Sequence, residues 1–384
     1  MQFIDLPTQQ KRIRTNLEKN IMAVLDHGKY IMGPEIAAIE KRLAQYVGVK
    51  HAIGCSSGTD ALLMALMAYN VGPGDAIFTT PFTFIATAEV IRLLGAVPVF
   101  VDIDPDTFNI DPQKLEEAIA AVMENDAALH PLPAVSGRLK AKGIIPVDLF
   151  GLPADYDAIN AVAQKHGLFV IEDAAQSFGA EYKGRKACSL AEIACTSFFP
   201  AKPLGCYGDG GMCFTDDDAL ADLMNSVKIH GKGTHKYDNA RIGINGRLDS
   251  LQAAILNAKF DIFPEEVDLR DRAAQQYNQM IAENGCELVT PGTPDNMRSV
   301  WAQYSLLARD EDHRAALQGK LKGGGIPSAI YYPKPLHMQT AFESLAYKAG
   351  DFPVSHDFST RIFSLPMHPY LEKEDQEKIA RAMY

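Results

Sequence analysis

The feature that most constrains this chain is the alternation of short apolar runs with helical segments from about residue 15 to residue 260. Strands are predicted at 51–55, 76–81, 98–103, 143–151 and 168–173. Helices are predicted at 17–26, 34–47, 60–68 and 86–94, and between the last two strands. Strands that alternate with helices form a largely parallel sheet covered on both faces. We therefore predict an α/β fold whose ligands gather at the carboxyl ends of the strands.

The pattern changes in the last third of the chain. A long polar helix at 264–284 is followed by weaker strand candidates at 304–308 and 328–333. The length of the chain also favours about two domains. We predict a large domain with a mostly parallel mixed sheet and a smaller C-terminal α+β domain. Their bounds are 1–260, including an N-terminal arm at 1–15, and 261–384.

Charge and cysteine usage restrict the partners and the compartment. A net charge of -11 argues against nucleic acid or an anionic membrane as partner, although a small anionic substrate stays open. The six cysteines form no CxxC pair and are predicted to be buried thiols in a reducing compartment. No signal peptide is evident, and the apolar runs reach half the length of a membrane span. A cytoplasmic protein is predicted.

The strongest local signal is Lys202, the single lysine of the apolar, glycine-rich segment TSFFPAKPLGCYGDGGMCFT at 196–215. A lysine is almost never fully buried unless it is paired or functional. Desolvation lowers the pKa of a lysine amine and leaves it free to attack an aldehyde. An imine with an aldehyde cofactor therefore explains this lysine. A lysine in a surface turn is the alternative for this segment taken alone.

An acidic residue ends the apolar strand of the run LFVIEDAAQSFGA at 168–180. There Asp173 could keep a pyridine nitrogen protonated, which a cofactor ring needs in order to act as an electron sink. Gln176, in the following turn, is placed to touch the substituents of that ring. An acid at a strand end also serves as a metal ligand or a helix cap in α/β folds, and this segment alone leaves those alternatives open.

A short Ser/Gly turn joins the strand at 51–55 to the next helix. Ser57, Gly58 and Thr59 fall at the helix start, where free backbone N–H groups and the helix dipole favour a phosphate group. Capping of the helix by Ser57 or Thr59 explains the turn equally well in isolation. A Walker-type loop is excluded, because the chain has no GxxxxGK[ST] motif.

An aromatic residue, Phe84, follows another predicted strand in the run PFTFIATAE. Its ring could stack on a cofactor, although a single phenylalanine more often belongs to a core. In chain order, the segments supply a phosphate-binding turn, an aromatic ring, a strand-end acid and a buried lysine. Together they indicate pyridoxal phosphate (PLP) far more specifically than any one of them.

The chain resembles the sugar-nucleotide aminotransferases of the DegT/StrS type. The resemblance runs through FIDLPTQQ, HGKYIMGPE, SGTDAL, EDAAQSFGA, SFFPAKPLGCYGDGG, NGRLDSLQAA and SLPMHPYL. It implies a fold-type-I PLP-dependent transferase, with pyridoxamine phosphate (PMP) as the intermediate form of the cofactor. The SFFPxKPLGCYGDGG run and the GKYIxGPE-like opening resemble the 3-oxo-uronate branch of the family.

The resemblance also implies roles for single residues. Lys202 would form the imine (Schiff base) with PLP, Asp173 would partner the pyridine nitrogen and Gln176 would contact the ring. The phosphate would be held by Ser57, Gly58, Thr59 and Ser197, and by Asn245 reaching over from a neighbouring subunit. Binding of the sugar nucleotide would involve Gly28, Lys29, Tyr30, Arg247, Tyr331 and Tyr332.

The substrates follow from the same resemblance. Enzymes of this branch aminate UDP-2-acetamido-2-deoxy-3-oxo-glucuronate with glutamate, on the way to diacetamido uronic acids of bacterial O-antigens. A homodimer with shared active sites is implied. The planar fork of Arg247 suits a carboxylate or a diphosphate, with a surface salt bridge as the alternative.

Two departures from the family pattern bear on the substrate. The family commonly has a His-Tyr-Pro run in the C-terminal domain, whereas this chain has Tyr331-Tyr332-Pro333 and so lacks one imidazole contact to the sugar. Residues 120–142, with two prolines and a Ser-Gly pair, read as a surface excursion that is longer than usual. The excursion either decorates the fold or borders the nucleotide site.

Three rival functions need to be distinguished. A related PLP dehydratase would carry a histidine in place of Lys202, so the lysine argues against it. An aminotransferase for a 3- or 4-keto-6-deoxy nucleotide sugar is the serious alternative. A cofactor-binding regulator would need a DNA-binding or interaction segment, and this acidic chain has no basic helix that could supply one.

Overall fold

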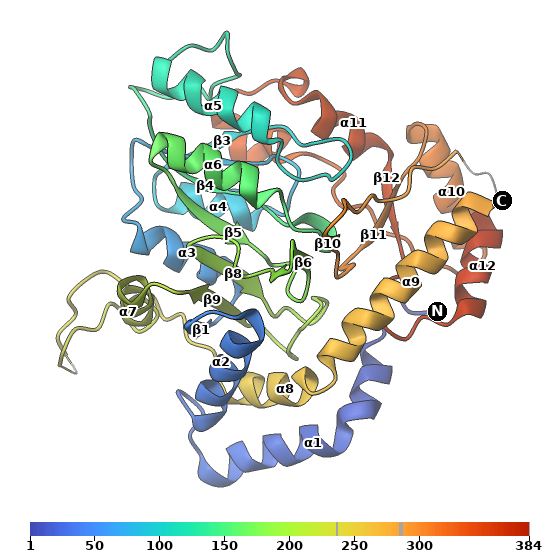
Figure 1. The fold of residues 1–384 in the computed structure, drawn as a ribbon, viewed down its shortest axis with the longest axis horizontal. Helices are drawn as coiled ribbons and strands as arrows, with labels where there is room; N and C mark the ends of the chain where they lie inside the picture. The colour runs from blue at the N-terminus through green and yellow to red at the C-terminus, as the bar shows by residue number, and fades with distance from the viewer. Residues whose placement is uncertain (236, 284–286, 384) are drawn as a thin grey trace.

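The computed structural model describes residues 1–235, 237–283 and 287–383, built around a seven-stranded sheet (Figure 1). In spatial order its strands are β1 (His51–Cys55), β9 (Gly211–Thr215), β8 (Ile193–Ser197), β5 (Phe169–Asp173), β4 (Lys140–Ile145), β2 (Asp75–Thr79) and β3 (Val97–Phe100). Strand β9 is antiparallel to both of its neighbours, and all pairs from β8 to β3 are parallel. This mostly parallel mixed sheet confirms the predicted α/β class.

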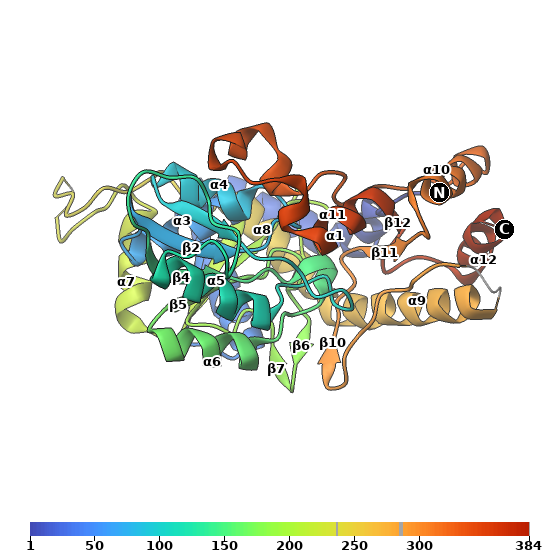
Figure 2. The same ribbon diagram turned by 90° about the horizontal axis from the view of Figure 1, so that it is seen from above.

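Helices cover both faces of the sheet (Figures 1 and 2). One face is covered by α3 (Gly58–Ala68), α4 (Ala86–Leu93) and α7 (Asp218–Val227). The other face is covered by α2 (Pro34–Val47), α5 (Pro112–Glu124), α6 (Tyr156–His166) and α8 (Ser250–Phe260). A sheet buried on both faces needs apolar side chains at successive positions, which explains the continuous apolar runs in the sequence.

The strand predicted at 143–151 is shorter than expected. Strand β4 ends at Ile145, and after one further bridge, from Val147 to Asp173, the chain leaves the sheet and forms the 3₁₀ helix η1 (Leu149–Gly151). Phe150 in this turn has a φ of 59°, a left-handed conformation that no strand contains. The turn brings Asp148 under the end of β5, where its backbone N–H donates to the carbonyl oxygen of Asp173 at 3.1 Å.

The N-terminal segment is mostly helical, and its description as an arm at 1–15 stays a prediction. Helix α1 (Leu6–His27) begins well before the helix predicted at 17–26. The carboxylate of Asp5 caps it by accepting the N–H of Thr8 at 3.0 Å. Ile13 and Leu17 are buried against α8. Packing against α8 therefore stabilises the residues that the sequence pattern left unassigned.

The C-terminal part has its own apolar core. Its elements are α9 (Phe263–Glu283), β11 (Tyr304–Leu307), α10 (Glu311–Gly323), β12 (Ile362–Leu365) and α12 (Lys373–Met383). The structure confirms the predicted strand at 304–308 and the helix predicted at 264–284 as far as Glu283, while residue 284 lies outside the described residues. The strand predicted at 328–333 is wrong, because only Ala329 forms an isolated bridge, to Ser364, and the chain then runs toward a cavity.

Part of the C-terminal segment returns to the large sheet. Residues 336–352 carry the 3₁₀ helices η2 (Leu336–Met338), η3 (Thr340–Leu345) and η4 (Ala349–Asp351) and pack against α4 and β3. The next helix, α11 (Pro353–Arg361), is capped from the large sheet, since the Asp102 carboxylate accepts the N–H groups of Val354 and Ser355. Sequence alone assigned this segment to the small domain, and the boundary at 261 stays a prediction.

The excursion at 120–142 is shorter than the sequence suggests. Helix α5 continues to Glu124 and β4 begins at Lys140. The His130 ring is hydrogen-bonded to the carbonyl oxygen of Phe100 at 2.8 Å, and the N–H of Ala134 donates to the carbonyl of Leu345 at 2.8 Å. The loop therefore lies over β3 and η3, and none of its described residues lines the cavity considered below.

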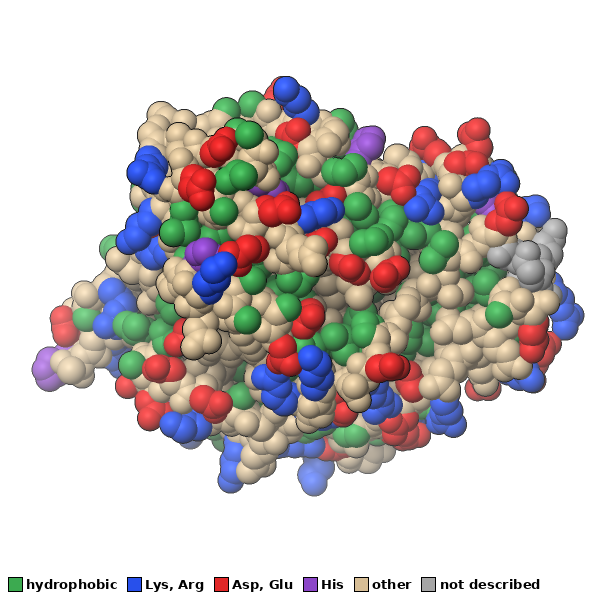
Figure 3. Space-filling view, turned by 45° about the horizontal axis from the view of Figure 1, so that its top comes forward, with side chains coloured by type: hydrophobic (Ala, Val, Ile, Leu, Met, Phe, Trp, Pro, Cys, Tyr) green, Lys and Arg blue, Asp and Glu red, His purple; other side chains and the backbone are tan. Residues whose placement is uncertain are grey.

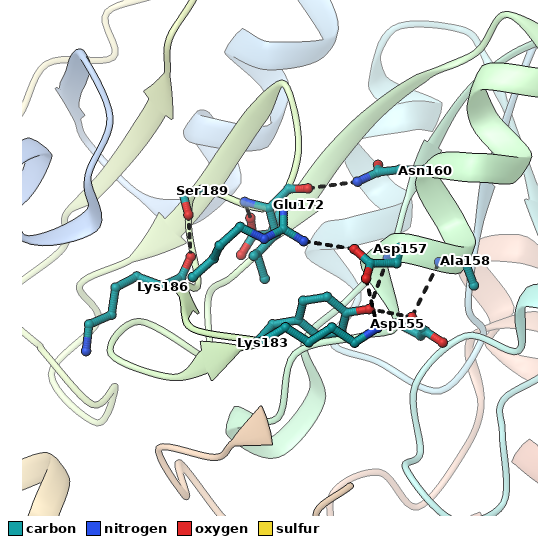
Figure 4. Close-up of polar contacts among 11 residues, drawn as sticks. Asp155, Asp157, Ala158, Asn160, Glu172, Lys183, Lys186 and Ser189 are labelled. Atoms are coloured by element: carbon teal, nitrogen blue, oxygen red, sulfur yellow. Dashed lines mark hydrogen bonds and ion pairs between the residues drawn. The ribbon is translucent and has the colours of Figure 1, made fainter. Parts of the chain in front are cut away.

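A small second sheet, in the order β10-β6-β7, lies beside α6. Its strands are β6 (Glu181–Tyr182), β7 (Arg185–Lys186) and β10 (Met297–Arg298). Asp157, in the first turn of α6, forms ion pairs with Lys183 and Arg185 of the hairpin (Figure 4). These contacts attach the hairpin to the large domain, next to the loop that follows β7.

The surface and the thiols add three observations. On the face shown in Figure 3, acidic and basic side chains are interspersed, without a continuous basic patch among the described residues. Within the described part of the chain, no helix is both long and apolar enough to cross a membrane. The cysteines at 55, 188, 195, 206 and 213 are buried and free, whereas Cys286 lies outside the described residues.

Candidate active site

An open cavity of about 620 Å³ lies at the carboxyl ends of the parallel strands. Side chains from the large sheet and from the C-terminal part line it together. Every predicted cofactor residue except Asn245 is among them, namely Ser57, Gly58, Thr59, Phe84, Asp173, Gln176, Ser197 and Lys202. The rule that parallel strands present ligand sites at their carboxyl ends therefore located this cavity.

The turn between β1 and α3 forms one end of the cavity. The hydroxyl oxygen of Ser57 caps α3 by accepting the N–H of Asp60 at 3.0 Å. The N–H groups of Gly58 and Thr59 have no acceptor among the described residues. A Cβ on Gly58 would lie 2.7 Å from the Cβ of Ser197, so only glycine lets the helix start approach the end of β8 this closely. The turn thus combines a capped helix with free donors suited to an anion.

Asp173 lies at the end of β5 with its carboxylate fully buried. Its Oδ2 accepts the hydroxyl of Thr87 at 2.7 Å, and its Oδ1 accepts the N–H of Ala175 at 3.2 Å. Burial raises the pKa of Asp173, while these two donors and the nearby Lys202 act in the opposite direction. The carboxylate is thus fixed in place, and a cation beside it would favour its charged form.

Lys202 lies in the turn after β8, where its N–H donates to the carbonyl oxygen of Phe199 at 2.9 Å. Its side chain is half-buried, because part of it faces the cavity, and it makes no side-chain hydrogen bond to a described residue. Burial lowers the pKa of the Lys202 amine, and the charge of Asp173 offsets this only in part. A neutral amine is therefore more accessible here than in water.

Gln176 and Tyr332 join the two parts of the chain across the cavity. The Oε1 of Gln176 accepts the N–H of Phe150 at 2.8 Å, and its Nε2 donates to the hydroxyl oxygen of Tyr332 at 3.2 Å. Tyr331 also lines the cavity. Phe84 lines it as well and keeps 54% of its surface exposed, which leaves the ring free to contact a ligand.

The remaining predicted residues do not line this cavity. Between α7 and α8 the described part of the chain includes a loop that extends beyond the body of the molecule (Figure 1). Its Asn245 is exposed, and Arg247 forms a bridge to Cys55. A further bridge, from Ile31 to Asp249, places the predicted substrate residues Gly28, Lys29 and Tyr30 beside this segment. They therefore form a second group outside this cavity, exposed except for Arg247, which is half-buried.

Sequence reasoning missed several residues that line the cavity. Thr87 and Thr83 face it from the first turn of α4 and the segment before it, and Gln303 faces it from the segment before β11. Thr87 lies in the same run as Phe84, at the second position of the helix predicted at 86–94, so a polar side chain at this helix start was a usable signal. Nothing in the local pattern indicated Gln303, because its place depends on the packing of the two parts.

The residues present fit PLP. The free N–H groups of Gly58 and Thr59 suit the phosphate, the buried Asp173 suits a protonated ring nitrogen, and the Lys202 amine has no protein partner among the described residues. The Oε1 of Gln303 is buried without a hydrogen-bond partner in the described part of the chain, as expected of a group that a ligand completes. No cluster of three or more possible metal ligands occurs among the described residues.

Comparison with known proteins supports the same chemistry. The model of the DegT/DnrJ/EryC1/StrS aminotransferase family matches residues 11–384. A relative from Pseudomonas aeruginosa, described as UDP-2-acetamido-2-deoxy-3-oxo-D-glucuronate aminotransferase, is 48% identical over 383 residues. The match covers 100% of this chain and 99% of the relative.

Solved structures extend the comparison to the fold and the cofactor. A DegT DnrJ EryC1 StrS aminotransferase from Brucella abortus superposes with a TM-score of 0.93 at 50% identity, over 100% of this chain and 98% of that one. NtdA from Bacillus subtilis with bound PMP gives a TM-score of 0.86 at 29% identity, over 99% of this chain and 82% of that one. These likenesses confirm the predicted fold-type-I architecture and the predicted cofactor.

Proposed function

The chain belongs to the DegT/DnrJ/EryC1/StrS aminotransferase family, and from this we infer that it aminates the 3-keto carbon of a UDP-linked 2-acetamido-2-deoxy-3-oxo-hexuronic acid. It is a PLP-dependent sugar-nucleotide aminotransferase. Glutamate is the proposed amino donor. The observation that carries the choice of sugar is the full-length similarity to the Pseudomonas aeruginosa relative, whose name states this substrate.

Lys202 is the residue proposed to accept and donate the proton of the reacting substrate carbon. When bound, PLP supplies the aldehyde that takes up the amino group and a ring that withdraws electrons from the reacting carbon. The amine of Lys202 would hold the cofactor, and burial lowers its pKa, so the amine is uncharged more often than a lysine in water. It can then accept a proton from the substrate carbon as a general base, and later donate a proton as a general acid.

Asp173, Gln176 and the turn at Ser57 are proposed to orient the cofactor. The Asp173 carboxylate, fixed by Thr87, would keep the proton on the ring nitrogen. The free N–H groups of Gly58 and Thr59, together with the hydroxyl groups of Ser57 and Ser197, would hold the phosphate. Phe84 and Gln176 would contact the cofactor ring from the walls of the cavity.

A homodimer with shared active sites completes this proposal. Among the described cavity residues Lys202 is the only basic side chain, so a diphosphate or a uronate carboxylate needs further positive charge. Lys29, Tyr30, Asn245 and Arg247 lie outside the cavity of their own protomer and would enter the neighbour's. Large apolar side chains around them are exposed, as in a surface that a second copy covers: Met22, Leu25, Ile31, Met32 and Ile242.

The biological setting is part of the proposal. A product with amino groups on a UDP-linked uronic acid fits the synthesis of bacterial O-antigen or another surface polysaccharide. Nucleotide-sugar precursors of this kind would be handled in the cytoplasm, and five buried free thiols suit a reducing compartment. The replacement of the family's usual histidine by Tyr331 would alter one contact to the sugar.

A panel of keto-sugar nucleotides, offered with glutamate, tests the substrate. We expect the enzyme to transfer the amino group to the UDP-linked 3-oxo-uronate. Mass spectrometry of the product detects this transfer. Turnover of a 3- or 4-keto-6-deoxy sugar, with none of the 3-oxo-uronate, would refute the proposed sugar and leave the enzyme class intact. Lys202→Ala is the matched inactive control.

A further inference from the structure

Two carboxyl groups are buried together at the end of β5, on the face of the sheet opposite the cavity. Glu172 and Asp148 are both fully shielded from solvent and lie within hydrogen-bonding reach of each other. Glu172 precedes Asp173 in the strand, so its side chain points to the opposite face of the sheet, away from the cavity. Neither residue lines the cavity, and neither contributes to the mechanism proposed above.

The donors around the pair are distributed unevenly. The Asp148 carboxylate accepts the N–H of Ala154 at 3.0 Å, the hydroxyl of Tyr156 at 2.9 Å and the hydroxyl of Ser177 at 2.7 Å. Glu172, labelled in Figure 4, lies beside the loop after β7. It accepts only backbone N–H groups of that loop, from Cys188 at 2.6 Å and from Leu190 at 2.9 Å. The three donors, two of them hydroxyl groups, favour the ionised form of Asp148.

No cation compensates the pair. Within the described residues, neither carboxyl group has a lysine, arginine or histidine in an ion pair, and the titratable groups that face them are Tyr156, Asp173 and Cys188. All three are neutral or acidic. Burial raises the pKa of both carboxyl groups, and the hydrogen bonds from Ser177, Ala154 and Tyr156 counteract this rise at Asp148. Two adjacent buried carboxylates without a cation cannot both ionise.

The pair is connected to the cavity side of the sheet by hydrogen bonds of the backbone and of side chains. The N–H of Asp148 donates to the carbonyl oxygen of Asp173 at 3.1 Å, and Ser177, held by Asp148, follows Gln176 directly. Two residues after Asp148, the N–H of Phe150 donates to Gln176 at 2.8 Å. A change of charge or geometry at Asp148 would therefore reach both residues that are proposed to contact the ring.

We propose that Asp148 and Glu172 share one proton, carried on Glu172, and act as positioning residues that fix Asp173 and Gln176 behind the cofactor. The inference rests on the proposed roles of Asp173 and Gln176. The proton lets Glu172 donate to the Asp148 carboxylate while its oxygens hold the loop after β7. One hydrogen bond thus joins the turn after β4 to the end of β5.

Infrared spectroscopy of the cofactor-free protein tests the shared proton. At neutral pH we expect the C=O band of a protonated carboxyl group in the wild type. Glu172→Gln removes the carboxyl group, and Asp148→Asn replaces the like charge with an amide that stabilises an ionised Glu172, so both variants should lose this band. Glu181→Gln, a change on the neighbouring hairpin, should keep it. A wild type without the band, or variants that retain it, would overturn the shared proton.

Unfolding as a function of pH gives an independent count of the proton. If Glu172 keeps its proton on folding, the folded wild type binds about one proton more than the unfolded chain at any pH above the ordinary glutamate pKa and below the raised pKa of Glu172. The free energy of unfolding of the wild type should then fall with rising pH more steeply than that of Glu172→Gln. The difference between the two slopes should correspond to about one bound proton. Equal slopes for the two proteins would contradict the inference, whatever their absolute stabilities.

The dissociation constant of PMP, which does not form an imine with the lysine, tests whether Asp148 positions Asp173 and Gln176. Asp148→Asn keeps the shape and two hydrogen-bonding atoms, so we expect its PMP dissociation constant within about twofold of the wild type, whereas Asp148→Ala should raise it about tenfold. A folded Asp148→Ala, checked by circular dichroism, that binds PMP as the wild type does would refute the positioning role. If the wild type itself fails to bind PMP, the proposed function fails instead.

Discussion

The side-chain amide of Gln176 donates a hydrogen bond to the hydroxyl oxygen of Tyr332 at 3.2 Å, across the cavity between the large sheet and the C-terminal part. The same amide group accepts the N–H of Phe150 through its oxygen at 2.8 Å, so its orientation is fixed from both ends. Burial raises the pKa of Tyr332, which keeps the hydroxyl protonated. The contact makes the geometry of the site depend on how the C-terminal part packs.

Tyr332→Phe should weaken cofactor binding. The substitution removes one neutral hydrogen bond, which contributes about 0.5–1.5 kcal/mol, so the PMP dissociation constant should rise roughly two- to tenfold. Fluorescence titration with PMP measures this. Tyr46→Phe, a tyrosine that packs against Phe260 outside the cavity, is the matched control and should leave the constant unchanged. An unchanged constant in Tyr332→Phe would show that the bond does not orient Gln176.

Thr87→Val should lower cofactor affinity more strongly. The valine keeps the shape of the side chain but leaves the buried Asp173 carboxylate without its 2.7 Å donor. Hydrogen bonds to charged groups contribute about 1.5–3 kcal/mol, so affinity for PMP should fall by roughly tenfold or more. Thr87→Ser retains the hydroxyl group and should behave as the wild type. Equal affinities of the valine and serine variants would exclude this role of Thr87.

Mixed dimers should reveal shared active sites. Lys202→Ala lacks the cavity lysine, and Asn245→Ala combined with Arg247→Ala lacks the group that lies outside the cavity. Each variant alone should be inactive. After the two are unfolded and refolded together in equal amounts, half of the dimers contain one intact site, and about a quarter of the wild-type activity should return. No recovery in dimers verified by mass spectrometry would contradict sharing.

Glu40→Gln should destabilise the strand that leads to Ser57. The Glu40 carboxylate accepts the N–H of Gly54 at 2.8 Å, and the buried ammonium group of Lys228 lies 3.4 Å from it and 3.3 Å from the carbonyl oxygen of Gly54. Removing the negative charge leaves a buried cation, so urea unfolding should show a loss of about 3 kcal/mol. The double variant Glu40→Gln with Lys228→Met should recover most of it, and simple additivity would refute the coupling.

Acidification should destabilise the protein through two histidines. Burial lowers the pKa of His337 and of His368 to about 4 in the folded chain. The unfolded chain binds these protons near pH 6.5, so the stabilising contribution is complete above that pH and is lost as the pH falls toward 4. Urea unfolding between these values measures the loss. In His337→Gln the free energy of unfolding should depend less steeply on pH, by the equivalent of about one proton. An unchanged slope would show that His337 does not contribute to the acid destabilisation.

Local patterns in the sequence determined the central site. Lys202, Asp173 and the turn at Ser57 each follow a strand of the same sheet, and parallel strands bring such positions together at one edge. Apolar runs identified β1 and β5 because a sheet covered on both faces must be apolar along its whole length, whereas β8, the strand before Lys202, was not among the predicted strands. The cavity therefore follows from chain order and residue type.

Tertiary structure alone decided the rest. The predicted strand at 328–333 is instead a segment that brings Tyr332 to Gln176, and residues 336–352 pack back on β3. The position of Arg247 beside Cys55, outside its own cavity, likewise depends on a bridge between distant segments. Such contacts join residues that are far apart in the chain, and their energy comes from packing between surfaces that no local periodicity encodes.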